Sequence, residues 1–178
     1  MRLIPLWSLC LAVVLQSVAW AQISPQTVDE RIHEATEKRE AARTYLCDGD
    51  YHREICYGED DFILGRVAEF QRRGDLTPAQ AYAQKCNALT MRLTPVASSQ
   101  YGESLLTEGG GLLSQAMFFL TNFDYDNAYT RALDAWDKFN QAWQWSAARS
   151  GKLAQLASEY KTLSDEVEKT FGVLYPNG

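Results

Sequence analysis

DNAYTRALDAWDKFNQAWQWSAARSGKLAQLASEYKTLSDEVEKTF, residues 126–171, is the longest regular pattern in the chain. Its apolar and small residues recur in alternating steps of four and three for more than five heptads. This rhythm is typical of coiled coils and long bundle helices, because it keeps one stripe facing a partner helix. The stripe consists of Ala132, Trp136, Phe139, Trp143, Ser146, Ser150, Leu153, Ala157, Tyr160, Ser164, Val167 and Phe171.

The centre of the stripe is polar, because Ser146 and Ser150 replace large apolar residues and Gly151 lies beside them. One long helix and two helices joined near Ser150–Gly151 both fit this pattern. We favour one helix, because no proline or polar turn cluster separates the halves. Trp145 lies off the stripe, so we expect it on the surface as a candidate interaction residue.

The segment before the heptads, residues 76–123, carries only four charged side chains and is a candidate for the interior or for an interface. Within it, 96–111 is rich in Ser, Gly and Thr and predicts a linker that holds a possible short helix at 100–106. The triple glycine 109–111 would be a hinge or, as we favour, a plain loop. Residues 112–121 are apolar on nearly all sides, which predicts a buried helix. Its candidate contact residues are Met117, Phe118 and Phe119.

Three shorter helices are predicted nearer the N-terminus. A charged amphipathic helix covers about 28–46 and is expected to stop at Cys47-Asp48-Gly49-Asp50. A second covers about 59–73, and a third runs from Thr77-Pro78 to Pro95, so that the turn at 73–77 makes an αα-hairpin. No segment alternates apolar and polar residues as a strand does. The fold class is therefore predicted as all-α, a helical bundle with a charged N-terminal helix, a central hairpin and a long C-terminal helix or helix pair.

The first 21 residues have the pattern of a cleavable secretory signal peptide: Met1-Arg2, an apolar run to Val18, and Ala19-Trp20-Ala21. A membrane anchor is the alternative, but the run is shorter than the roughly 20 residues that span a bilayer. We expect cleavage near Ala21 and a periplasmic or secreted protein. Residues 22–178 would then form a single helical domain with three parts: 22–95, 96–123 and 124–178.

Composition argues against some ligands. Without Arg2 the chain has a net charge of −7, and its Lys and Arg residues form no cluster. Nucleic acids and anionic membranes both require such a cluster, so neither is an expected partner. No second apolar stretch is long enough for a stable membrane span after cleavage.

Three cysteines, Cys47, Cys56 and Cys86, would reach an oxidising compartment, where two are expected to pair. An antiparallel hairpin brings the regions of Cys56 and Cys86 together, which favours that bond. A Cys47–Cys56 bond is the alternative. The remaining thiol is expected to be buried, and a mixed disulfide or a covalent dimer is the alternative.

Catalytic and metal-binding patterns are sparse. His33 and His52 have no partner at metal-ligand spacing, so no metal and no cofactor is predicted. Glu103 and Glu108 stand alone in the segment with few charges, and are candidates for paired-carboxylate chemistry. No residue is assigned a catalytic role.

These observations predict an exported, non-catalytic helical protein that acts through protein–protein interaction. It could be a subunit of an envelope, secretion or conjugation complex, or an inhibitor or immunity protein. The expected partner is another envelope or secreted protein, or a second copy bound through the C-terminal helix. The alternatives are a cell-wall glycan enzyme that uses Glu103 or Glu108, and a carrier of apolar small ligands.

Overall fold

The computed structural model describes residues 23–176, so the predicted signal peptide and its cleavage site lie outside the described residues. Within this range the chain forms helices only, which confirms the all-α bundle. The helices are α1 (Pro25–Arg73), α2 (Leu76–Ala97), α3 (Gln100–Thr121) and α4 (Tyr125–Leu174).

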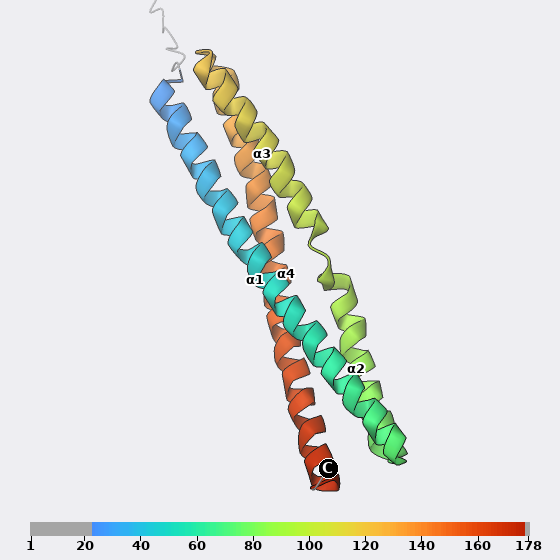
Figure 1. The fold of residues 1–178 in the computed structure, drawn as a ribbon. Helices are drawn as coiled ribbons and strands as arrows, with labels where there is room; N and C mark the ends of the chain where they lie inside the picture. The colour runs from blue at the N-terminus through green and yellow to red at the C-terminus, as the bar shows by residue number, and fades with distance from the viewer. Residues whose placement is uncertain (1–22, 177–178) are drawn as a thin grey trace, which may run out of the picture.

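The helices form a long rod (Figure 1). Helices α1 and α4 lie side by side and run in the same direction, as contacts near both ends show: Arg31 with Tyr129, and Arg66 with Glu168. Helices α2 and α3 return in the opposite direction, one after the other, so α2 covers one half of the α1–α4 pair and α3 the other half. Helix α3 ends, and helices α1 and α4 begin, at the same end of the rod. We call it the tip end.

Helix α1 passes through the segment where the sequence predicted a stop. The predicted end at Cys47–Asp50 is wrong, and the separate helix at 59–73 is the last part of α1. The reason is a seven-residue repeat of buried positions that continues through Gly49. Packing against α4 therefore outweighs the poor helix propensity of the Asp-Gly-Asp sequence. The repeat consists of Val28, Ala35, Ala42, Gly49, Cys56, Ile63 and Phe70.

Helix α4 is one continuous helix, which confirms the favoured alternative. Half of the residues in the predicted stripe are completely buried: Ala132, Phe139, Ser146, Leu153, Tyr160 and Val167. Trp136 and Trp143 lie at the edge of the core and are half-buried, where the Lys38 ammonium lies over both rings.

The predicted αα-hairpin is present between α1 and α2. Gly74 adopts a left-handed conformation with φ of 88°. Its N–H donates to the carbonyl of Gln71, and the N–H of Asp75 donates to the carbonyl of Phe70. These two bonds close the end of α1 in the usual way for a glycine after a helix.

The predicted linker at 96–111 is wrong, because only Ser98 and Ser99 interrupt the helices there. Helix α3 continues through the triple glycine. Gly109 is buried against α4, where the Phe139 ring fills the space that a side chain would need. The predicted burial of 112–121 is also wrong, since Leu113 and Ala116 are buried whereas Met117 and Phe118 are exposed.

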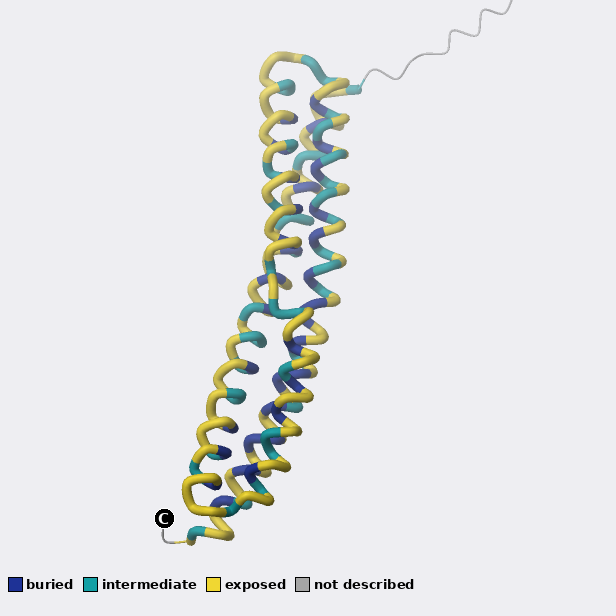
Figure 2. The backbone as a smooth tube through the Cα atoms, turned by 90° about the vertical axis from the view of Figure 1, so that its right-hand side faces the viewer, coloured by how far each residue is buried: buried dark blue, intermediate teal, exposed yellow. Residues whose placement is uncertain are grey.

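The core differs between the two halves of the rod. In the α1–α3–α4 half, alanine and glycine line much of the contact between helices, as at Ala35, Ala42 and Ala135. In the α1–α2–α4 half, larger side chains form a continuous cluster around Phe70 and Tyr160. Burial follows the inner faces along the whole rod (Figure 2). None of the described helices combines the length and apolar character that crossing a membrane demands.

The predicted disulfide is absent among the described cysteines, because Cys47, Cys56 and Cys86 are all free thiols. Cys56 and Cys86 belong to the same buried cluster. They have different partners there, since the Cys56 thiol donates to the carbonyl of Leu153 and the Cys86 thiol donates to the carboxylate of Asp60. Cys47 is exposed. Neither the Cys56–Cys86 bond nor the Cys47–Cys56 bond is present.

We expect the three thiols to alkylate in two classes. Burial raises the pKa of Cys56 to about 11, and burial together with Asp60 raises the pKa of Cys86 to about 12. Both are therefore neutral and enclosed near pH 8, because the reactive form is the thiolate. Iodoacetamide followed by mass spectrometry should label Cys47 at once, and the other two only after unfolding without reductant. A pair that stays unlabelled after unfolding would show that a disulfide forms in the protein as isolated.

Candidate interaction site

The two predicted acids, Glu103 and Glu108, lie on α3 but contact different neighbours. Glu103 accepts a hydrogen bond from Ser99 and lines a shallow groove between α3 and α1. Glu108 forms an ion pair of 2.6 Å with Lys138 of α4, which lowers the pKa of its carboxyl. A general acid needs a raised pKa, so this pairing gives Glu108 the opposite property.

Polar side chains meet around Gly49 at the middle of the rod. We call this group the junction layer; it consists of Asp48, Gly49, Asp50, Arg149 and Ser150. Arg149 is only 3% exposed. Its guanidinium donates to the carbonyls of Val96 and Ala97 at the end of α2, at 2.9 Å each, and to Asp50 at 2.8 Å.

The junction layer serves the fold. The last carbonyls of a helix have no partner within the helix, and Arg149 supplies one where α2 ends. Gly49 makes room for it, since a Cβ there would lie 2.7 Å from the Arg149 Nη1 atom. Ser150 donates a hydrogen bond to Asp48 in the same layer. The polar centre seen in the heptads is therefore where α2 and α3 separate.

A second buried polar group surrounds Asp60 of α1. One carboxylate oxygen accepts hydrogen bonds from Cys86 at 3.0 Å, Thr90 at 2.9 Å and Tyr160 at 3.1 Å. Burial is the main cause that raises the pKa of the Tyr160 hydroxyl, so it stays a neutral donor. The group links α1, α2 and α4, and its members satisfy one another.

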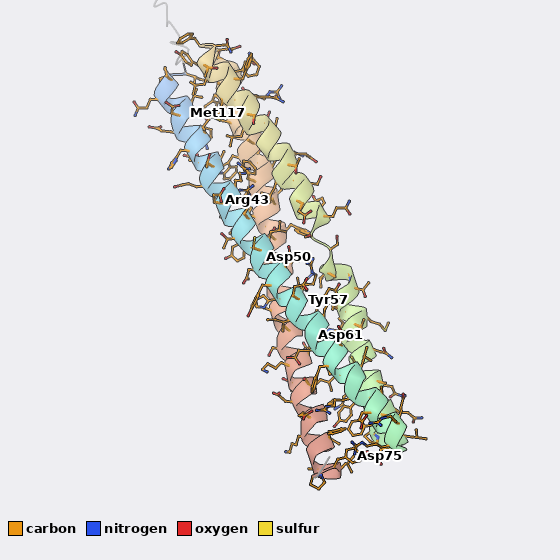
Figure 3. The ribbon with its side chains drawn as sticks, viewed as in Figure 1. Arg43, Asp50, Tyr57, Asp61, Asp75 and Met117 are labelled. Carbon is orange, nitrogen blue, oxygen red and sulfur yellow. The ribbon has the colours of Figure 1, made fainter. Side chains whose placement is uncertain are left out.

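Three large apolar side chains are exposed at the end of α3 and in the turn that follows it. Met117, Phe118 and Phe123 are 54%, 64% and 78% exposed, and we call them the apolar tip. Met117 lies near this end of α3, whereas Asp75 lies at the opposite end of the rod (Figure 3). Phe119 is half-buried, and its ring contacts that of Phe118 edge-on. Of the predicted contact residues, Met117 and Phe118 are therefore on the surface.

Phe123 is held in a left-handed conformation, with φ of 61°. Its N–H donates to the carbonyl of Leu120, and the N–H of Asp124 donates to that of Phe119. The turn between α1 and α2 makes the same pair of bonds with Gly74 at the corresponding position. A bulky residue with positive φ costs about 1–2 kcal/mol, which glycine avoids. The chain therefore keeps a strained phenylalanine exposed where glycine would fit better.

Carboxylates surround the apolar tip. Asp124 and Asp126 line a shallow depression beside Phe123, and Asp29 and Glu30 lie in the first turns of α1. Arg31 and Arg131, near the starts of α1 and α4, pair with other acids, Glu34 and Asp134. The tip is consequently apolar and negatively charged.

The opposite end of the rod carries a shallow apolar groove between α2 and α4, which we call the tail groove. It is lined by Tyr82, Glu166, Lys169, Thr170, Val173 and Leu174. Val173 is 73% exposed. The neighbouring acids Glu166 and Glu168 pair with Lys85 and Arg66. Lys169 of the groove has no ion pair with a described residue. Asp165, four residues earlier on α4 and without an ion pair among the described residues as well, is not part of the groove lining.

Sequence reasoning placed Trp145 wrongly. Trp145 is half-buried, because its ring lies against Gly102 and meets the Tyr101 ring edge-on. Phe123 was not singled out. The signal for it was available, since Asn122-Phe123-Asp124 is a helix-to-helix turn with no glycine, unlike Arg73-Gly74-Asp75.

Comparison with known proteins gives no family: no family model matches the chain, and no curated protein or solved structure is significantly similar to it. Among residues 23–176, no three His, Cys, Asp or Glu side chains gather as a metal site requires. The apolar tip is therefore the feature from which a function can be argued.

Proposed function

We propose that this protein is an exported, non-catalytic binding protein whose apolar tip contacts another protein in the periplasm or outside the cell. The observation that carries the proposal is Phe123, a strained and exposed aromatic residue beside Met117 and Phe118. Strained backbone persists where function needs it. Exposed apolar clusters on helical proteins commonly mark protein-binding sites.

The polar groups of the interior support the same proposal. Arg149 holds the end of α2, and Asp60 accepts three internal hydrogen bonds. Each group is explained by the fold it stabilises. Of the two predicted acids, Glu108 is paired with Lys138, which lowers the pKa of its carboxyl.

Site-specific photocrosslinking in the native cell envelope tests the proposal. We expect a photoreactive residue at Met117 to capture a protein partner, because a binding surface holds its partner within reach of the probe. The matched control is Met91 of α2, which is 79% exposed but lies away from the tip. Equal capture at both positions, or none at Met117, would contradict the proposal.

The glycan-enzyme alternative has a separate test. Glu103→Gln and Glu108→Gln variants should leave peptidoglycan turnover unchanged if the protein only binds. Loss of turnover in the Glu103 variant would replace our proposal, since Glu103 is the acid that lines a groove.

A further inference from the structure

We propose that the apolar tip of one molecule docks into the tail groove of a second copy, so that the protein assembles head to tail. This inference rests on the proposed binding role of the tip and names its partner. It also refines the expectation that copies associate through the C-terminal helix, because Val173 and Leu174 of the groove belong to α4.

Shape is the first argument. Phe123 stands 78% exposed at one end of the rod, and the tail groove is a depression with mainly apolar walls at the other end. An aromatic side chain that fills an apolar depression is the usual anchor of a protein interface. Since both features face solvent, burying them together removes apolar surface from water on both partners.

Charge is the second argument. The tip carries Asp124 and Asp126 next to Phe123, with no arginine free beside them. The tail groove carries Lys169 without an ion pair to a described residue. Two tips would repel each other, whereas a tip and a tail groove are complementary. The charges therefore favour head-to-tail contact over a symmetric tip-to-tip dimer.

The positions of the two surfaces determine how large the assembly becomes. The two surfaces are different and lie at opposite ends of a rod (Figure 3). Contact between unlike surfaces leaves one free tip and one free groove on every assembly, so it adds further copies and does not stop at a dimer. The expected product is an open chain whose length grows with protein concentration.

Sedimentation of the purified protein over a wide concentration range tests this. The mean mass of the wild type should rise with concentration. Phe123→Gly should weaken association roughly thirtyfold, as expected for a central aromatic anchor. The same variant should melt about 2–4 °C higher, because glycine relieves the left-handed strain. Weaker association with a higher melting temperature excludes unfolding as the cause.

A mixing experiment identifies the two surfaces. Phe123→Gly keeps its groove, and Val173→Asp keeps its tip, so each alone should associate far more weakly than the wild type. Mixed, they should form a species that stops at the dimer. Lys169→Glu should also weaken association, and Asp126→Lys in the same chain should restore part of it.

Three results would overturn head-to-tail assembly: a wild type that is monomeric throughout, a mixture that grows beyond the dimer, or a charge exchange that restores nothing. A monomeric protein that still crosslinks through Met117 to a different protein would overturn this inference alone and leave the proposed binding role standing. A protein that neither self-associates nor crosslinks through Met117 would overturn this inference and the proposed binding role together.

Discussion

Replacing Arg149 by leucine is expected to lower the free energy of unfolding by about 1.5–3 kcal/mol, the contribution of buried hydrogen bonds to a charged group. The change removes the buried guanidinium from Asp50 and from the carbonyls of Val96 and Ala97. Arg53 still contacts Asp50 at 3.2 Å and the Ala97 carbonyl at 3.4 Å, so the loss falls mainly on Val96. Urea unfolding followed by circular dichroism would measure the loss. Amide exchange should rise first around 96–99, where α2 loses its cap.

The matched control is Arg131→Leu. It lies on the same helix, but its 3.4 Å pair with Asp134 is exposed. Exposed pairs contribute at most about 1 kcal/mol, so this variant should stay close to the wild type. Arg149→Lys should fall between the two, since an ammonium cannot make three separate contacts in the same directions. If Arg149→Leu unfolds like the control, the junction layer does not hold α2 in place.

Replacing Gly109 by alanine is expected to destabilise the protein by about 1–3 kcal/mol through overpacking. The new Cβ would lie 2.5 Å from one atom of the Phe139 ring and 2.7 Å from another. That ring is completely buried, so it has no room to retreat. The loss should exceed the gain of about 0.5–1 kcal/mol that alanine normally brings to a helix.

The neighbouring glycines provide the controls. Nothing lies within 4 Å of a Cβ built at Gly110 or Gly111. Alanine at either position should therefore stabilise the protein by about 0.5–1 kcal/mol, the opposite sign to Gly109. Phe139→Leu combined with Gly109→Ala should cost less than the sum of the two single changes, because the smaller side chain relieves the contact. Equal effects at all three glycines would mean that α3 does not approach α4 closely at Gly109.

Local pattern was enough to predict the elements that obey it. The heptads predicted the long helix α4, and Gly74 followed by Thr77-Pro78 predicted the hairpin. Both predictions need only neighbours in sequence, since helix periodicity and turn residues act within a few positions. The charged N-terminal helix was also expected, but with its end too early.

The two errors in the helix boundaries share one physical cause. Asp48-Gly49-Asp50 and the triple glycine have poor intrinsic propensity for helix, so local reasoning ended helices there. In the folded chain these small residues are the ones that let another helix come close: Gly49 beside Arg149, and Gly109 beside Phe139. A residue that weakens an isolated helix can thus be required by the contact between two helices. That contact depends on a partner about 30 to 100 positions away in the sequence.

The candidate site shows the same division. Met117 and Phe118 were selected from sequence as apolar, but their exposure was not foreseen, and Phe123 acquired meaning only from its left-handed backbone. The amino-acid sequence by itself determined that the chain is helical and where its longest helix lies, and it predicts a secretory signal peptide at residues 1–21. The tertiary structure decided which small residues continue helices, which cysteines stay apart and which aromatic side chains face solvent. Those properties depend on distances between helices that are remote in sequence, and no local pattern contains them.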